Sequence, residues 1–306
     1  MRALVNARVR FLYLTCCILW GSTWLVIKLG LRDLPPLLFA ASRMSLAAAL
    51  LFPFALRAGL LRLRRVDWLA IGGIGLLQIG IPYALLFAAQ QWVPSGLSAV
   101  LFATFPVWLL LLARVILPNH LLRPRAVAAA GLGLAGIVVL ELPALRGQNL
   151  GQGVATGGAL IVGAAMMIAL ANLLVRRSLA DRAPILITFV QVLAGAALLV
   201  CAAALERGRP AEWTPRALAA VAYLALFGTA LTYLALFWVL PRLSVAALGA
   251  IPLLDTTVAV SLGALVLREP VGWPLVGGGA LVLTGALLAG FVEPEPPGAG
   301  LPESSA

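Results

Sequence analysis

The residue with the most evident chemical potential is an aspartate inside a long apolar run. Asp255 lies three residues after Pro252, near the centre of the stretch 243–267. A carboxylate in an apolar environment is costly unless it is protonated, paired or hydrated, so such a residue marks a binding or proton-transfer site. The alternative is local, because Pro252 frees backbone groups that the side chains of Asp255 and Thr256 would cap. Both interpretations remain open at this point.

Aromatic and amide side chains form a second group of candidates. Trp20 and Trp24 lie one helical turn apart, where both indole N–H groups need partners if they are buried. Tyr83 and Tyr233 occupy matching places in the two halves of the chain and would give an aromatic pocket with two hydroxyls, suited to a planar amphipathic solute. The competing explanation is packing between helices. The candidate substrate-binding residues are Trp20, Trp24, Gln78, Tyr83, Phe87, Asn172, Thr229, Tyr233 and Asp255.

Three basic residues lie within apolar runs or close to their ends. Arg43 either provides a counter-charge for Asp255 or snorkels to the nearby outer interface. Lys28 and Arg176 occupy matching places near the ends of their runs. They serve either as charges at the two mouths of a pathway or as anchors that mark where a run ends.

Motifs for enzymatic, metal or nucleotide chemistry are missing from the sequence. The only histidine is His120, and neither an HExxH motif nor a GxxxxGK[ST] loop occurs. Cys16, Cys17 and Cys201 lie in apolar runs at irregular spacing, which is neither a disulfide framework nor a metal-ligand pattern. We therefore expect no catalytic residue, no cofactor and no metal. A membrane-embedded enzyme and a channel with rings of like charge are the less favoured classes.

The candidates must be positioned by helices that cross a membrane. Apolar residues make up 62% of the 306 positions and charged residues only 11%, too little charge for a water-soluble surface. The apolar runs are about 20 residues long, which is enough to cross a hydrocarbon core of about 30 Å. The expected fold is all-α, with ten transmembrane helices at 11–31, 35–57, 68–91, 95–117, 124–141, 151–175, 183–205, 216–239, 243–267 and 272–292.

The basic residues predict how these spans are oriented. The net charge of +11 comes from short loops between spans rather than from one continuous face, so no nucleic-acid partner is expected. With ten spans both termini share a side, and that side carries about twice as many basic residues as the other. The positive-inside rule then places both termini in the cytoplasm. We expect the membrane to be the inner membrane of a bacterium. The Pro- and Glu-rich stretch 293–306 is expected to be a disordered cytoplasmic tail.

The two halves of the chain match each other at a nearly constant offset, which predicts an internal repeat. The matched pairs are Lys28 with Arg176 and Pro36 with Pro184, 148 residues apart, and Tyr83 with Tyr233, Phe87 with Phe237 and Pro124 with Pro274, 150 residues apart. Five spans is an odd number, so the second copy enters the membrane from the opposite side. The predicted units are 1–146 and 147–292, followed by the tail.

Four segments carry a resemblance to a known family. They are LWGSTWLVIKLGL (19–31), PPLLFAASRM (35–44), SGLSAVLFATFPVWLLLLARVIL (95–117) and VLREPVGWPLVGGGALVLTGALL (266–288). In these segments the chain resembles the EamA family of the drug/metabolite transporter superfamily, and within it the YddG-type exporters of aromatic amino acids. Two departures are Asn119, where many members carry an acidic residue that the second half keeps as Glu269, and MMIALANLLVRR (166–177), which lacks the tryptophan-rich pattern of the first span.

The resemblance implies a fold and an activity. Spans 1, 3, 4, 6, 8 and 9 are expected to surround a central cavity, while spans 5 and 10 pack together at the edge. Small residues four apart in spans 5 and 10 independently favour such a close approach. The implied function is a monomeric secondary transporter that exports small organic metabolites, most of all aromatic amino acids, by alternating access. A multidrug or other metabolite carrier of the same fold is the alternative.

Overall fold

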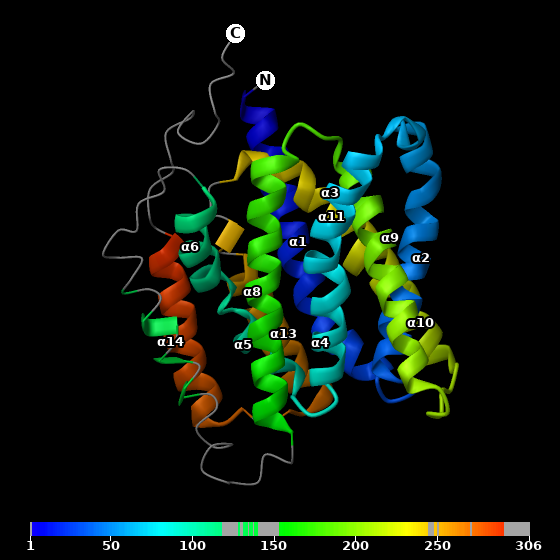
Figure 1. Ribbon diagram of the computed structural model, residues 1–306. Helices are drawn as coiled ribbons and strands as arrows, with labels where there is room; N and C mark the ends of the chain where they lie inside the picture. Colours follow the sequence, from blue (N-terminus) through cyan, green and yellow to red (C-terminus); the bar gives the residue numbers. More distant parts are fainter. Residues whose placement is uncertain are drawn as a thin grey trace.

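The structure of the protein is a computed structural model that describes residues 2–117, 153–243, 248–249, 251–269 and 271–290, together with 128, 131–133, 135–136 and 138–139. The regular structure in these residues is helical, and the helices lie side by side in one bundle (Figure 1). The α-helices are α1 (Arg2–Gly30), α2 (Pro36–Arg57), α3 (Arg65–Gly75), α4 (Ile81–Ala89), α5 (Ser95–Phe102), α6 (Phe105–Ile116), α8 (Val154–Ser178), α9 (Pro184–Ala203), α10 (Pro215–Ala225), α11 (Thr232–Val239), α13 (Ile251–Leu267) and α14 (Trp273–Gly290). Short turns complete them: η1 (Leu60–Arg62), η2 (Leu76–Gly80), η3 (Ala204–Glu206), η4 (Leu226–Leu231) and η5 (Leu240–Arg242).

Seven helical segments of the described chain are long and apolar enough to cross a membrane. They are Ala7–Gly30, Pro36–Arg57, Arg65–Ala89, Ser95–Ile116, Val154–Ser178, Pro184–Glu206 and Pro215–Arg242. Each agrees with a predicted span to within a few residues. Two shorter apolar helices, Leu254–Leu267 and Trp273–Gly285, lie within the last two predicted spans.

Some predictions fall on residues that the structure does not describe. The span predicted at 124–141 is described only in part, and the tail at 293–306, Asn119 and His120 lie outside the described residues. Ten spans therefore stay a prediction.

Several helices begin where proline prepares the backbone for them. Pro36, Pro184 and Pro215 lie in the first turn of α2, α9 and α10, where a backbone N–H would have no helical partner. At the start of α10 the Thr214 hydroxyl accepts a hydrogen bond from the N–H of Ala217 at 3.1 Å, which caps the helix. Helix boundaries therefore follow local sequence chemistry.

Two spans are interrupted at matching places by wider π-turns. η2 separates α3 from α4, and η4 separates α10 from α11 in the second half of the chain. In η2 the sequence cause is Pro82, which has no N–H to donate to the carbonyl of Gln78. In η4 the hydroxyls of Thr229 and Thr232 donate to the carbonyls five residues earlier and stabilise the wider turn. Both interruptions lie just before the tyrosines of α4 and α11.

The helices of the two halves interlock rather than form two separate bundles. α2 packs along α9 more extensively than any other pair among the described helices, α1 packs on α13, α10 and α11, and α8 packs on α4, α5 and α6. Large apolar side chains also face outward, and Leu61, Val115 and Leu265 are 87%, 79% and 79% exposed. Such an apolar exterior suits lipid rather than water.

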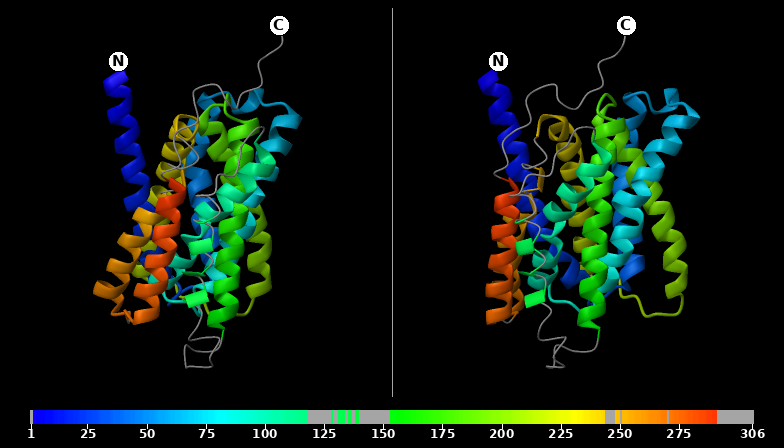
Figure 2. Two further views of the ribbon diagram at one scale, coloured as in Figure 1. Left: turned by 90° about the vertical axis from the view of Figure 1, so that its left-hand side faces the viewer. Right: turned by 60° about the vertical axis from the view of Figure 1, so that its left-hand side comes forward.

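The edge of the bundle is formed by α14, which packs on α6 and α5 (Figure 2). The described part of the fifth predicted span approaches this helix closely. A Cβ atom added at Gly136 would lie 2.7 Å from the carbonyl oxygen of Gly278 and 2.6 Å from a methyl carbon of Val282. The close approach expected for these two spans therefore occurs at Gly136, a different residue from the small pairs that suggested it.

Among the described residues, one ionic link joins the two halves at each end of the bundle. Asp33, in the loop after α1, accepts hydrogen bonds from Arg216 and from Thr214, the latter at 2.7 Å. At the opposite end, Arg182 donates to Asp67 at 2.7 Å. The hydrogen bonds from Arg216 and Thr214 hold the pKa of Asp33 at about 2, below the ordinary range of aspartate. Both links tie a loop of one half to the start of a helix of the other.

Candidate functional site

A cavity of about 80 Å³ lies inside the bundle. Seven of the predicted spans contribute to its wall, namely the six that the resemblance implied and also α2. Its lining is mostly aromatic and aliphatic, with a small number of polar groups, which is typical of sites for small organic molecules. The lining residues are Trp20, Thr23, Trp24, Ile27, Arg43, Gln78, Tyr83, Leu86, Phe87, Phe102, Phe105, Ile168, Asn172, Tyr233, Leu236, Leu248, Ile251, Pro252 and Asp255.

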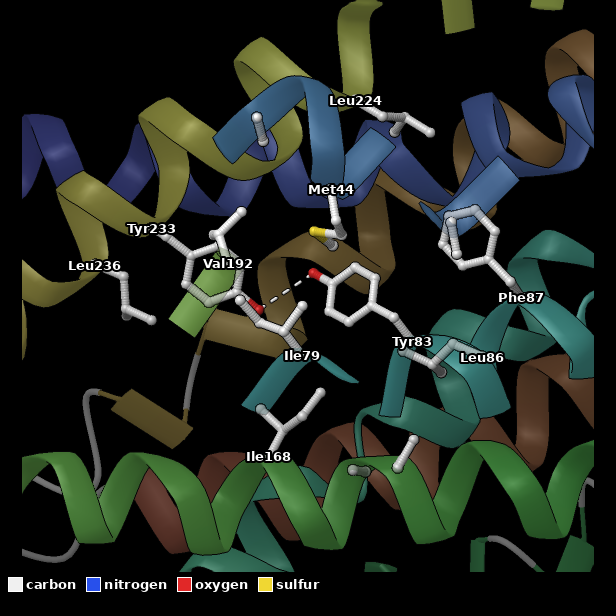
Figure 3. Packing of buried hydrophobic residues seen from close by; sticks show 14 of the residues in the cluster. Met44, Ile79, Tyr83, Leu86, Phe87, Ile168, Val192, Leu224, Tyr233 and Leu236 are labelled. Atoms are coloured by element: carbon white, nitrogen blue, oxygen red, sulfur yellow. Dashed lines mark hydrogen bonds between the residues drawn. The ribbon is translucent and has the colours of Figure 1, made fainter. Parts of the chain in front are cut away.

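Two tyrosines meet in this cavity, one from each half of the chain. The hydroxyl oxygens of Tyr83 on α4 and Tyr233 on α11 are 3.2 Å apart, so one hydroxyl donates to the other. Figure 3 shows the two rings pointing toward each other, with Met44 on one side and Ile168 of α8 on the other. Tyr83 is 7% and Tyr233 2% exposed. The structure thus brings together the two residues whose matched positions suggested an aromatic pocket.

The remaining aromatic residues extend the same wall. Trp20 packs edge-on against Tyr233, with ring centroids 5.7 Å apart, and Trp24 packs against Phe102 at 5.5 Å. Phe87 lies 6.2 Å from the ring of Tyr83. Edge-on and tilted contacts at these distances are the favoured geometries of aromatic pairs. Both tryptophans of α1 therefore face the cavity as well as packing between helices.

Three buried oxygen atoms on cavity-lining residues have no hydrogen-bond partner in the described structure. They are Oδ1 of Asp255, Oδ1 of Asn172 and Oε1 of Gln78, on residues that are 1–3% exposed. The amide nitrogen of Asn172 donates to the carbonyl of Ile168 in its own helix, which leaves only its oxygen unpaired. A buried oxygen atom that can accept a hydrogen bond but receives none is energetically costly. They suit a ligand that donates hydrogen bonds.

The contacts of Asp255 bear on its two open interpretations, a functional site and a cap after Pro252. Pro252 and Asp255 both lie within the described part of α13, Ile251–Leu267. The hydroxyl of Thr256 donates to the carbonyls of Pro252 and Ala99 rather than capping an N–H group. Oδ1 of Asp255 has no partner, whereas a cap would accept from the backbone.

Arg43 lines the cavity, although the sequence-based candidate list omitted it. Its side chain is 1% exposed, so it does not snorkel, and it forms no ion pair with Asp255 within the described chain. Its Nε donates to the Thr229 hydroxyl at 2.8 Å and its Nη2 to the Gly228 carbonyl at 2.9 Å. The guanidinium lies 4.9 Å from the centre of the Tyr83 ring, within cation–π range. The signal for this residue was an arginine in mid-span, which needs a partner wherever it is buried.

Thr229 is the one predicted binding residue that does not line the cavity. Its hydroxyl accepts from Arg43 and donates to the carbonyl of Leu224, so both of its hydrogen-bonding roles are taken. The cavity lining therefore does not include Thr229, and its membership of the binding surface stays a prediction. The residue instead holds the arginine that does line the cavity.

Lys28 and Arg176 have matching structural partners. Lys28 donates to the carbonyls of Gln90 and Val93 at 2.6 and 3.0 Å, just after the end of α4. Arg176 donates to the carbonyl of Leu243 at 3.3 Å, and Leu243 follows Val93 by 150 residues. A cation at the carbonyl end of a helix is favoured by the helix dipole. These contacts support the anchoring interpretation of both residues.

Glu269 provides a further connection near the cavity-lining helices. Its carboxylate accepts hydrogen bonds from the N–H groups of Ser95 and Gly96 at 2.8 and 3.0 Å and from the Ser95 hydroxyl at 2.9 Å. A carboxylate at the N-terminus of a helix satisfies donors that have no helical partner, and it interacts favourably with the dipole. Glu269 therefore fixes the start of α5 to the loop before α14.

Comparison with known proteins agrees with this architecture. Residues 8–142 and 155–291 each match the family described as EamA-like transporter family. YedA of Escherichia coli (strain K12), described as an uncharacterized inner membrane transporter, is 31% identical over 248 residues, which cover 80% of this chain and 78% of YedA. The uncharacterized transporter YoaV of Bacillus subtilis (strain 168) is 25% identical over 277 residues, 90% of this chain and 94% of YoaV.

Two further comparisons bear on part of the chain and on the fold. A probable amino-acid metabolite efflux pump of Salmonella typhimurium is 30% identical over 141 residues, 46% of this chain and 45% of that protein. A solved crystal structure superposes with a TM-score of 0.65 at 23% identity, covering 92% of this chain and 97% of that one, which shows that the fold is shared. The double match to one family, the apolar helices and the internal cavity lead to one conclusion. The chain is a membrane transporter that belongs to the EamA-like transporter family.

Proposed function

We propose that the protein is a secondary transporter that exports small organic metabolites, aromatic amino acids above all, by alternating access around the cavity. The observation that carries this proposal is the hydroxyl contact between Tyr83 and Tyr233, 3.2 Å long, at a junction between the two halves. A cavity at the interface of two repeats, walled by aromatic rings, is where such carriers bind their solutes. Aromatic rings favour a flat apolar group on the solute.

The polar atoms of the cavity support an amino group on that solute. An ammonium group has three N–H donors and no acceptor. The unpaired oxygens of Asp255, Asn172 and Gln78 are acceptors without donors. The similarity to a probable amino-acid metabolite efflux pump over part of the chain is consistent with a solute of this class.

Alternating access is supported by features that occur twice. α1 and α8 run in opposite directions along the bundle (Figure 1). The π-turns η2 and η4, and the contacts of Lys28 and Arg176 with carbonyls 150 residues apart, recur in corresponding places. An inverted repeat lets the two halves exchange conformations, so that the cavity faces each side in turn. We place the protein in the bacterial inner membrane as a monomer with both termini in the cytoplasm, as the distribution of arginines favours.

The experiment is a flux assay in liposomes that contain only this protein. Vesicles loaded with L-phenylalanine, L-tryptophan or L-alanine are assayed for efflux with and without a pH gradient. We expect the aromatic solutes to leave faster than L-alanine. Equal efflux rates for all three solutes, or rates no higher than in solute-loaded liposomes without the protein, would refute the proposal.

A pair of tryptophan variants separates binding from stability. Trp24 is 6% exposed in the cavity wall, whereas Trp273 is 66% exposed on α14. Trp24→Leu should lower efflux of the aromatic solutes about two- to tenfold more than efflux of L-alanine, since an aromatic contact contributes about 0.5–1.5 kcal/mol. Trp273→Leu should leave the ratio unchanged. An equal loss for all solutes in Trp24→Leu would indicate a purely structural role for this tryptophan.

A further inference from the structure

Arg43 is a buried cation whose charge is not neutralised within the described chain. It is 1% exposed in the first half of α2, and its two hydrogen-bond acceptors, the Thr229 hydroxyl and the Gly228 carbonyl, are both neutral. None of the ion pairs among the described residues includes it. A buried charge without a counter-charge is strongly unfavourable, so its presence in a cavity wall needs a reason other than stability.

The guanidinium still has donors to offer. It carries five N–H groups, and the two hydrogen bonds to Thr229 and Gly228 use only some of them. A planar fork of N–H donors matches the two oxygens of a carboxylate. Nearby, the ring of Tyr83 covers the guanidinium at 4.9 Å and leaves it beside the tyrosine pair.

We infer that Arg43 binds the carboxylate of the transported solute, which supplies a counter-charge that no ion pair among the described residues provides. This inference rests on the proposed function and assigns a second end to the same site. The solute's carboxylate lies at Arg43, and its amino group lies at the unpaired oxygens of Asp255, Asn172 and Gln78. The cavity thereby distinguishes a zwitterion from a simple amine or a neutral aromatic molecule.

The neighbouring π-turn builds the position of the arginine. The wider turn η4 places the Thr229 hydroxyl and the Gly228 carbonyl against α2. Gly228 also provides space, because a Cβ atom there would lie 3.0 Å from Nη2 of Arg43 and 2.8 Å from a methyl carbon of Thr23. Both polar contacts orient the side chain without neutralising it, so the charge remains available to a ligand.

A structural role makes different predictions. If Arg43 only connects α2 to η4, its removal lowers the stability of the protein and weakens the binding of every solute equally. If it binds a carboxylate, its removal affects solutes according to their charged groups. Three probes share one phenyl ring and differ only in those groups: L-phenylalanine, 3-phenylpropionate and 2-phenylethylamine.

The test measures the affinity of the purified protein for each probe by the rise in its melting temperature. Arg43→Gln should weaken the binding of L-phenylalanine and 3-phenylpropionate about tenfold to a hundredfold, which is the effect of losing a charge-assisted hydrogen bond. The same variant should bind 2-phenylethylamine within about twofold of the wild type. Arg64→Gln, a change of the same chemistry at a side chain 74% exposed, is the matched control and should change none of the three. Equal weakening of all three probes in Arg43→Gln would overturn the inference.

A second variant, Arg43→Lys, and a fourth probe, propionate, complete the test. Arg43→Lys retains the charge but loses the planar fork, so it should fold and bind the two carboxylates with intermediate affinity. If Arg43→Gln fails to fold, wild-type affinity for the carboxylate probes in Arg43→Lys contradicts the inference. If the wild type binds no aromatic probe, the proposed function fails. Propionate then decides separately, because greater stabilisation of the wild type than of Arg43→Lys supports a carboxylate site, and equal stabilisation refutes it.

Discussion

Replacing Tyr233 by Phe removes one hydroxyl from the wall of the cavity and leaves the aromatic ring in place. The partner is the Tyr83 hydroxyl, 3.2 Å away. Hydrogen bonds between hydroxyls are usually about 2.7–2.8 Å long, so this one belongs to the weaker part of the range of about 0.5–1.5 kcal/mol. We expect a coupling of about 0.5–1 kcal/mol between the two hydroxyls, about two- to fivefold in an equilibrium constant.

The assay is a double-mutant cycle on Tyr83→Phe, Tyr233→Phe and the double variant. The free energy of unfolding is measured in detergent for the four proteins, and the coupling is the deviation from additivity. The same four proteins are then assayed for phenylalanine efflux. Because the contact joins α4 and α11, a conformation that separates these helices lacks it. Each single variant should therefore favour that conformation by the same two- to fivefold factor, about the equivalent of 0.5–1 kcal/mol.

Tyr223 provides the matched control, because it has a comparable contact outside the cavity. Its hydroxyl and that of Ser22 are 2.7 Å apart between α10 and α1. Tyr223→Phe should lower stability without altering the preference for aromatic solutes. The reasoning would be refuted by additive effects of Tyr83→Phe and Tyr233→Phe, or by a change of solute preference in Tyr223→Phe.

Two further predictions concern carboxylates. The pKa of Asp33 is held at about 2 by Arg216 and Thr214, so its stabilising contribution is complete above the unfolded-state value and is lost as pH falls from about 4 to about 2. The melting temperature of wild type should drop through this window, and that of Asp33→Asn should change less; parallel curves would contradict the assignment. Asp255→Asn keeps the shape of the side chain and removes its charge. If Asp255 couples protons, efflux should continue but no longer respond to a pH gradient. If it binds an amine, exchange itself should fall, and unchanged flux with unchanged pH response would exclude both roles.

The sequence alone predicted the seven described spans and the correspondence of the two tyrosines, for different reasons. Apolar length decides whether a helix can cross a membrane, so the ends of α2 and α9 lie within two residues of the prediction, whereas α1 begins at Arg2, nine residues before the predicted span. The constant offset between the halves placed Tyr83 and Tyr233 in corresponding positions. The hydroxyl contact shows that both tyrosines lie on helices where the two halves of the chain meet.

Arg43 and Thr229 show where sequence reasoning ended. Period and offset predict which face of a helix is apolar, but they do not predict how two helices are rotated against each other. The snorkelling hypothesis for Arg43 assumed contacts at the membrane interface. The pairing hypothesis assumed that Asp255 was its partner. The hydrogen-bond acceptors that Arg43 has in the structure depend on the widened turn η4, which contains no proline that would predict it from the sequence. The threonines that stabilise this turn are ordinary residues in any apolar span.

The distance along the chain between Arg43 and its acceptors matters during synthesis. Thr229 follows Arg43 by 186 residues. At about 5–20 residues per second, the ribosome takes about ten to forty seconds to deliver it. Throughout this interval α2 has left the ribosome with a guanidinium that has neither its native partners nor any solute. The nascent chain must therefore keep α2 near water, in the insertion machinery or at the membrane surface, until η4 arrives.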